Sequence, residues 1–484
     1  MDGLDPERFR ALGYRAIDMI AEQLSNLPDG PTRRPVPTHI RHDLEDQPIP
    51  EHGADPFALL ERVNDEVLAY PMGNPSPRFF AWVNSTPSHI GILGDMFAAA
   101  MSPSAAGGDQ AATYVERAAL TWIKDMLGFP QDAQGLLVSG GSMANLTALS
   151  VMRHVKSQNN VRANGMMAEP QQMIVYTSAH GHSCIEKAVH MLGIGSNNLR
   201  IIPLDDQYRM DVDKLREAIA IDRAAGLYPV CVAASAGTTN TGAIDKLDEI
   251  ADICEAENLW FHIDGAYGGF GILSEQANHM YSGMNRADSI AVDPHKWMYV
   301  PVECGCVFVR NGQAMRDTFS LVPAYLQEDR AEPWFSEYGI QQTRGFRALK
   351  VWLTIQHFGL DGYREMISND IRTAHDLRRK LNARNDFEIV TDGPLSVTCF
   401  RYVPAGVPEE MLDTVQRQVV EWTNHSARAF ITTTMIDGKC VIRACHVNFR
   451  TTSEDLDALL DTLAEAGQHV PVLQQEEMNS YAVA

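Results

Sequence analysis

Short apolar runs alternate with helical stretches between Gly135 and Arg310, and this alternation restricts the possible folds more than any other feature. Continuous apolar runs are typical of strands buried on both faces, and helices between consecutive strands favour parallel pairing. The pattern therefore predicts an α/β fold with a mostly parallel central sheet. We expect strands at Gly135–Ser139, Met173–Tyr176, Leu199–Ile202, Val230–Ala234, Trp260–Ile263, Ser289–Val292 and Cys306–Val309, and helices at Met143–Met152, Cys184–Leu192, Val212–Ile219 and Leu247–Ala256.

The strand–helix alternation is absent from the sequence on either side of this region. Apolar residues at helical spacing predict two amphipathic N-terminal helices, around Phe9–Leu24 and Phe57–Leu68, joined by an extended connector at Pro28–Pro50. Such an arm buries little surface by itself, so we expect it to lie on a dimer partner. The C-terminal part predicts a small α+β domain, with a helix at Phe346–Phe358 and strands at Glu388–Val390, Val397–Phe400 and Lys439–Ala444.

The chain has 484 residues, which is too many to fold around a single hydrophobic core of ordinary size. We expect a helical dimerisation arm at 1–85, a large domain at 86–345 and a small domain at 346–484. The net charge of −22, without a lysine- or arginine-rich run, argues against a nucleic-acid partner. The sequence has neither a bilayer-length apolar stretch nor a signal-peptide pattern, so we expect no membrane partner and a cytoplasmic location. The eight scattered cysteines fit reduced thiols there.

Two predicted strands end in charged residues that suit a flat, cationic ligand better than core packing. Asp264 directly follows the strand at Trp260–Ile263, and Lys296 comes shortly after the strand at Ser289–Val292. Ligands of parallel sheets bind beyond the carboxyl ends of the strands, so both side chains are expected at one edge. A lysine is costly to bury there unless it is neutral or used covalently. A lysine Schiff base with an aspartate beside the pyridine nitrogen is the known arrangement for pyridoxal 5'-phosphate (PLP).

The segment Ser139–Asn145 joins a strand to a helix through two glycines. Adjacent glycines let the backbone approach an anion closely, and the N–H groups at a helix start favour negative charge. Ser142 can cap this helix and donate its hydroxyl to a phosphate oxygen. The segment therefore predicts a phosphate-binding turn.

Two histidines, His180 and His182, follow another predicted strand. We expect no metal site, because no carboxylate or cysteine cluster completes a coordination sphere. His182 instead suits stacking on an aromatic cofactor. Ser183, with Glu186 three residues later, predicts a capping box for the next helix, and Asp245 is the expected N-cap of a later one.

Several motifs stand in a fixed order along the chain: Pro77–Trp82, Ser139–Asn145, His182–Ala188, Gly237–Asp245, His262–Gly268, Asp293–Trp297 and Arg344–Lys350. Together they resemble the group II PLP-dependent amino-acid decarboxylases, and most closely the aromatic L-amino-acid branch. The resemblance covers nearly the whole chain. It implies the aspartate-aminotransferase fold (fold type I) and a homodimer with N-terminal helices packed across the interface.

The resemblance also implies a role for each matching residue. Lys296 would hold the cofactor as a Schiff base, and Asp264 would face the pyridine nitrogen. His182 would stack on the ring, with Ala266 against its other face. Further cofactor contacts are implied for Gly141, Ser142, Ser235 and His295.

The implied activity is decarboxylation of an L-amino acid, expected to be aromatic, to the amine and carbon dioxide. Phe80, Trp82 and Ser85 are the candidate substrate-binding residues, although both aromatic rings are equally compatible with core packing. The segment 104–109 is small and polar, which leaves room for a wider pocket.

The product depends on a tyrosine that returns a proton to Cα in this family. Phe335 aligns with that tyrosine and Tyr338 lies three residues later, so Tyr338 is the expected donor. Without a donor, reaction with oxygen would give an aldehyde, ammonia and peroxide, and an aromatic aldehyde synthase is therefore the alternative. An aminotransferase uses the same electron sink and is a further alternative.

Three other interpretations remain open at this point. Arg443 could clamp a substrate carboxylate or be structural. Asp293 stands where the family often has asparagine, and an acid would repel a phosphate dianion, so we do not expect that contact. A non-catalytic scaffold is disfavoured because the full set is present, namely Lys296, Asp264, His182 and Ser142.

Overall fold

The computed structural model describes residues 4–321 and 332–470, and the predicted α/β fold is confirmed within them. A seven-stranded sheet has the order β1-β7-β6-β5-β4-β2-β3. The pairs from β3 to β6 are parallel, and β7 runs antiparallel to both of its neighbours. All seven predicted strands are present: β1 (Gln134–Val138), β2 (Met173–Ser178), β3 (Leu199–Ile202), β4 (Tyr228–Ser235), β5 (Trp260–Asp264), β6 (Ser289–Val292) and β7 (Gly305–Val309).

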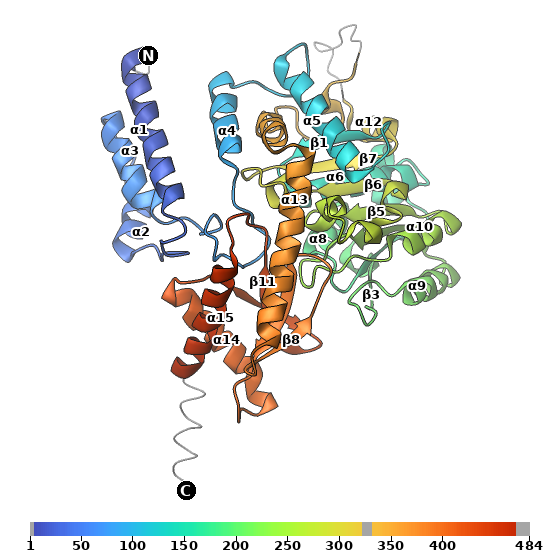
Figure 1. The fold of residues 1–484 in the computed structure, drawn as a ribbon. Helices are drawn as coiled ribbons and strands as arrows, with labels where there is room; N and C mark the ends of the chain where they lie inside the picture. The colour runs from blue at the N-terminus through green and yellow to red at the C-terminus, as the bar shows by residue number, and fades with distance from the viewer. Residues whose placement is uncertain (1–3, 322–331, 471–484) are drawn as a thin grey trace. The chain divides into compact units, whose positions relative to one another are not determined.

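Helices pack around this sheet (Figure 1). One helix, α6, contacts β4 to β7, whereas α9 and α10 pack on β3 to β5. The predicted helices are α6 (Gly141–Lys156), α8 (Ser183–Met191), α9 (Val212–Ala224) and α10 (Leu247–Ala256). Sequence reasoning did not identify α4 (His89–Met101), α5 (Ala111–Leu127), α7 (Val161–Asn164), α11 (Pro294–Trp297) or α12 (Gly312–Phe319).

Residue contacts divide the chain into two compact units. Unit 1 comprises the chain up to Trp82, His375–Val390 and the chain from Cys399 onwards, and unit 2 comprises Val83–Ala374 and Thr391–Thr398. The boundary falls inside α13 (Ala348–Asn382), which has a kink at Gly359 with φ 65° and ψ 174°. The three predicted domains stay a prediction, but the N-terminal arm shares its unit with C-terminal residues. Within the described ranges, every helix is too short or too polar to cross a membrane.

Unit 1 contains the N-terminal helices and the C-terminal α+β elements. Its helices are α1 (Pro6–Ser25), α2 (Thr38–Glu45), α3 (Pro56–Val63), which continues as a π-helical turn at Asn64–Leu68, α14 (Glu409–Ser426) and α15 (Ser453–His469). The second sheet has the order β10-β11-β9-β8, from β10 (Thr432–Ile436), β11 (Lys439–Cys445), β9 (Val397–Tyr402) and β8 (Phe387–Thr391). The proline-rich connector was expected to have little helix, but α2 forms because it lies between prolines and contains none.

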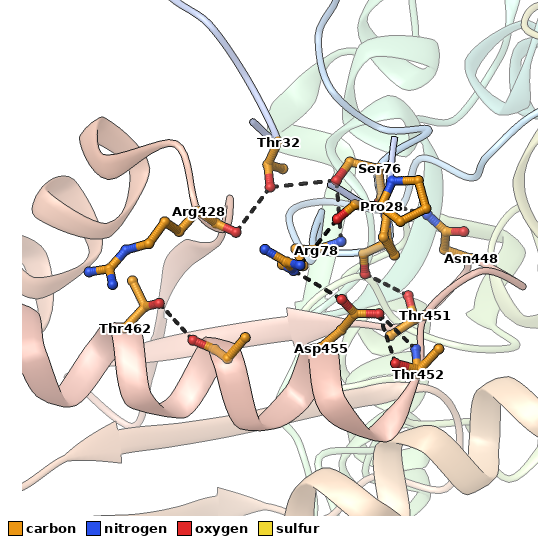
Figure 2. A network of polar contacts seen from close by, with 12 residues as sticks. Pro28, Thr32, Ser76, Arg78, Arg428, Asn448, Thr451, Thr452, Asp455 and Thr462 are labelled. Carbon is orange, nitrogen blue, oxygen red and sulfur yellow. Dashed lines mark hydrogen bonds and ion pairs between the residues drawn. The ribbon is translucent and has the colours of Figure 1, made fainter. Parts of the chain in front are cut away.

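A polar network in unit 1 binds the proline-rich connector to α15 (Figure 2). The guanidinium of Arg78 donates to Asp455 Oδ1 at 2.9 Å and to the carbonyl of Pro28 at 3.1 Å. Asp455 also accepts from the backbone N–H of Thr452 at 2.9 Å, which completes a capping box at the start of α15. Thr32 donates its hydroxyl to the carbonyl of Arg428 at 3.2 Å. One carboxylate therefore both caps a helix and holds the N-terminal arm.

Unit 2 contains a buried ion pair between Arg344 and Glu116, whose side chains are each 1% exposed. The guanidinium also donates to the carbonyls of Ala105 and Leu137, both at 2.7 Å. Glu116 accepts from the N–H of Leu137 at 3.2 Å. The pair thus joins α5, β1 and the segment before α13. Because both charges are desolvated, removing one leaves the other uncompensated.

Glu116→Gln should therefore lower the free energy of unfolding by about 3 kcal/mol, measured by urea denaturation. Glu61→Gln is the matched control, because Glu61 pairs with Arg15 and their side chains are 48% and 39% exposed. This exposed change should cost less than about 0.5 kcal/mol. Equal losses in the two variants would contradict the importance assigned to the buried pair.

Candidate active site

A cavity of about 340 Å³ lies in unit 2 beyond the carboxyl ends of β4, β5 and β6. This is the edge at which parallel sheets bind ligands. The cavity is large enough for a cofactor-sized molecule. The structure brings together there eight residues that the sequence singled out: Gly141, Ser142, His182, Ser235, Asp264, Ala266, His295 and Lys296.

Lys296 lies on α11, the short helix that follows β6. Its Nζ is 3.1 Å from Oδ2 of Asp293, which is 1% exposed. Burial by itself lowers the pKa of Lys296, but the carboxylates of Asp293 and Asp264 outweigh it, so this pKa lies above its ordinary value. The neighbouring His295 hydrogen-bonds the carbonyl of Cys304 through Nδ1 at 2.7 Å. The lysine is thus held in the cavity as an ion pair.

Asp264 ends β5 and is 8% exposed. Its Oδ1 accepts from the N–H of Ala266 at 3.1 Å. The thiol of Cys184 lies 3.8 Å from its Oδ2. An anion fixed by neighbouring donors at the cavity wall suits a cationic ring nitrogen.

The start of α6 forms another part of the cavity wall. A Cβ added to Gly141 would lie 2.9 Å from both the Cβ of Ala266 and Oδ2 of Asp293, so the site requires glycine. Ser142 was expected to cap α6, but it is the second residue of the helix, and the cap position, Gly140, has no side chain. A helix start without a side-chain cap suits an anion such as phosphate.

His182, and not Ser183, caps α8. Its Nδ1 accepts from the N–H of Cys184 at 3.2 Å, which fixes the ring at the cavity mouth. The predicted capping box is therefore wrong, because α8 begins at Ser183, one residue earlier than that motif requires. The sequence signal was a serine with a glutamate three residues later. This spacing alone does not determine which residue becomes the N-cap.

Asp245 was also expected to be an N-cap, but its side chain binds two backbone N–H groups outside α10 instead. It accepts from the N–H of Met210 at 2.6 Å and from that of Ser235 at 2.7 Å. Lys246 occupies the cap position of α10. Burial raises the pKa of Asp245 to about 6. This carboxylate positions Ser235 at the cavity.

Two predicted site residues of unit 2, Ser85 and Tyr338, are not among the described residues that line this cavity. The Ser85 hydroxyl donates to the carbonyl of His295 at 3.0 Å and so supports the lysine-bearing turn. Tyr338 is buried, and burial raises its pKa. It follows a 3₁₀ turn in which the Phe335 ring packs on the guanidinium of Arg344 at 5.2 Å.

This turn contacts the small, polar segment that the sequence singled out at 104–109. The N–H of Ser336 donates to the carbonyl of Ala106 at 3.0 Å. The segment expected to supply the proton donor and the segment expected to widen the pocket therefore lie side by side.

The other two candidate substrate residues, Phe80 and Trp82, belong to unit 1. Phe80 is 1% exposed in the core of that unit and meets the ring of His446 edge-on at 5.4 Å. Trp82 is 43% exposed and packs against Phe430. Arg443 donates to the carbonyl of Trp82 at 3.0 Å, which is a structural contact. Their substrate roles remain predictions.

The cavity also contains residues that sequence reasoning did not assign. Several of them lie inside the motifs already quoted, so the signal was present but no role followed from it. Glu303 had no sequence signal, because it lies in the irregular segment before β7. These additional lining residues include Asn145, Cys184, Thr238, Thr239, Tyr267 and Glu303.

Known proteins resemble this chain over almost its whole length. Residues 37–403 match the pyridoxal-dependent decarboxylase conserved domain. The aromatic-L-amino-acid decarboxylase of Bacillus atrophaeus is 36% identical, over 97% of this chain and 97% of that protein. Phenylacetaldehyde synthase of Arabidopsis thaliana is 28% identical, over 93% and 94%. The crystal structure of Oryza sativa TDC with PLP and tryptamine has a TM-score of 0.90 at 26% identity and covers 97% and 99%.

The chain belongs to the pyridoxal-dependent decarboxylase family, and it is an amino-acid decarboxylase that uses PLP. The cavity fits this cofactor. Lys296 offers an amine, Asp264 an anion and the glycine start of α6 a cradle for a phosphate. Oδ1 of Asp293 is buried without a hydrogen-bond partner, as expected of a site that a polar ligand completes.

The ion pair with Asp293 should control how fast Lys296 captures the cofactor. Only the neutral amine attacks the aldehyde of PLP. Asp293→Asn removes an anion that raises the pKa of Lys296, so more of the amine is neutral at pH 7. The loading rate there should rise about tenfold for each unit by which the pKa falls. The measurement is the growth of visible absorbance after mixing cofactor-free protein with PLP across a pH series.

Asp95→Asn is the control, because Asp95 is a half-exposed carboxylate that pairs with Lys350 instead. It should leave the pH profile of loading unchanged. Identical profiles for wild type and Asp293→Asn would refute the control assigned to this ion pair.

Proposed function

We propose that the protein decarboxylates an aromatic L-amino acid and releases the amine and carbon dioxide. The chief support is that Lys296 and Asp264 line one cavity at the sheet edge. The aromatic substrate class is supported by the Bacillus atrophaeus relative, which is named for that class, and by the Oryza sativa structure, whose title includes tryptamine.

We propose the following roles for the cavity residues. When bound, PLP supplies an electron sink for the pair left at Cα as carbon dioxide departs. Lys296 binds the cofactor covalently, and Asp264 holds a proton on its ring nitrogen because a nearby anion favours the cationic form. His182 and Ala266 bracket the ring. Gly141, Ser142, Ser235 and His295 hold the rest of the cofactor.

The proton that completes the amine is proposed to come from Tyr338. Burial keeps this phenol protonated at neutral pH, as a proton donor requires. An aldehyde synthase is the second candidate function. It is favoured by Phe335, which aligns with the family tyrosine, and by the similarity to phenylacetaldehyde synthase.

A panel of L-amino acids with quantified products tests these proposals. The wild type should release amine and carbon dioxide in equal amounts, with aromatic substrates preferred and no peroxide. Lys296→Ala should abolish the reaction, whereas the exposed control Lys214→Ala should not alter it. Tyr338→Phe should shift the product from amine to aldehyde with peroxide, and the control Tyr402→Phe should not. Aldehyde and peroxide from the wild type would establish the second candidate instead.

We also propose that the protein is a homodimer in the cytoplasm. The cytoplasmic location is supported by its eight cysteines, all buried and free of disulfides. The dimer is supported by exposed apolar side chains on helices of both units. In unit 2, α4 exposes Met96, Phe97 and Met101 by at least half. In unit 1, α1 and α3 expose Phe9, Tyr14, Leu59 and Val63.

Phe97→Glu should convert the dimer into a monomer, because it places a charge in the proposed interface. Light scattering coupled to size-exclusion chromatography measures the mass. Met167→Glu is the control, because Met167 is 98% exposed on a short turn outside those helices. A monomeric wild type, or a dimer that survives Phe97→Glu, would contradict the proposed interface.

A further inference from the structure

Five hydrogen bonds connect six buried side chains in one line that ends at the wall of the cavity. We call this line the donor chain. Its members lie on β5, β6, α6 and α8, all within unit 2, and the most exposed of them is 8% exposed. In order they are Trp260, Ser289, His262, Asn145, Cys184 and Asp264.

The direction of the first bonds follows from what each group can donate. The indole of Trp260 can only donate, and its Nε1 lies 2.8 Å from Oγ of Ser289. That hydroxyl therefore has its own hydrogen available for Nδ1 of His262, also at 2.8 Å. Burial lowers the pKa of His262 to about 4, so the ring is neutral at pH 7 and carries one proton. The amide oxygen of Asn145, which faces Nε2, can only accept, so that proton is on Nε2 and Nδ1 accepts from Ser289.

The remaining bonds continue in the same direction. His262 Nε2 donates to Oδ1 of Asn145 at 2.6 Å. The amide nitrogen of Asn145 donates to Sγ of Cys184 at 3.2 Å. Burial raises the pKa of this thiol, so it keeps its hydrogen. The S–H is then left to donate to Oδ2 of Asp264, 3.8 Å away.

In every hydrogen bond of the donor chain, the donor is thus the member farther from Asp264. An ionised carboxylate accepts and never donates, so a line of donors that ends on Asp264 favours its anionic form. Neighbouring hydrogen bonds in a low-dielectric interior polarise one another, which strengthens the last one. The N–H of Ala266 occupies the other oxygen.

We propose that Cys184 and Asn145 are positioning residues, supported by His262, Ser289 and Trp260, which keep Asp264 deprotonated and aimed at the ring nitrogen of the cofactor. This inference rests on the role proposed for Asp264. A purely structural network would only satisfy buried polar groups. The donor chain additionally requires that the charge of Asp264 depend on the S–H group.

The first experiment uses cofactor-free protein and infrared spectroscopy of the S–H stretch. Subtracting the spectrum of Cys184→Ala from that of the wild type isolates the band of Cys184, and Cys184→Ser replaces it as the reference if the alanine variant does not fold. Asp264→Asn should shift this band to higher frequency, because a neutral amide is a weaker acceptor than a carboxylate. An unshifted band would overturn the proposal, whether or not the protein is active.

The second experiment compares Cys184→Ala with Cys184→Ser after loading with PLP. Both variants lose the sulfur, but serine keeps a donor for the carboxylate. The alanine variant should bind PLP about tenfold more weakly, as expected for a lost hydrogen bond to a charged group, and serine should restore the affinity. The control Cys231→Ala removes a buried thiol that is not part of the donor chain. This variant should bind PLP as tightly as the wild type does.

Nitrogen NMR with a labelled pyridine nitrogen gives the direct measure of protonation. The nitrogen should remain protonated in the wild type and Cys184→Ser and lose proton occupancy in Cys184→Ala. Equal spectra and affinities for the alanine and serine variants would overturn the donor chain. Failure of the wild type to attach PLP at Lys296 would instead refute the proposed role of that lysine, and the infrared result would remain valid.

Discussion

The parallel register of β5 and β6 determines where the chemistry of this protein lies. Asp264 pairs with Ala291, so β5 ends next to the strand that leads into Lys296. Parallel strands present their carboxyl ends at one edge, and a shift by one residue would turn Asp264 to the opposite face of the sheet. Cation and anion meet because of backbone pairing, and the cofactor cavity depends on that pairing.

Three aspartates near this edge show how surroundings give one residue type different properties. Asp293 forms an ion pair with the amine of Lys296. Asp264 accepts a hydrogen bond from a backbone N–H and another from a thiol. Asp245 is buried against two backbone N–H groups, and its pKa rises to about 6. Position in the fold decides whether each carboxylate pairs with a charge, lines the cavity or accepts hydrogen bonds from the backbone.

The sheet, and the residues that meet at the cavity on its edge, could be predicted from the sequence, because apolar runs and the motifs at their ends are local signals. Helix caps could not, since His182 in place of Ser183 caps α8 through a backbone angle that composition does not encode. The helix α2 was not predicted because the connector is rich in proline overall, although the eight residues that form the helix include none. The donor chain was invisible for another reason: residues such as Asn145 and His262 meet only after β5 and α6 have packed together.

The contact between Arg78 and Asp455 spans 377 residues of sequence. On a ribosome the arm therefore emerges long before α15 exists, and it cannot reach its final place until synthesis is nearly complete. Until then its apolar helix faces are exposed to solvent, a condition that favours aggregation and the binding of chaperones. The sheet of unit 2 is under no such delay, because its strands are complete by Val309. Synthesis from N- to C-terminus thus makes the first segment of the chain among the last to be ordered.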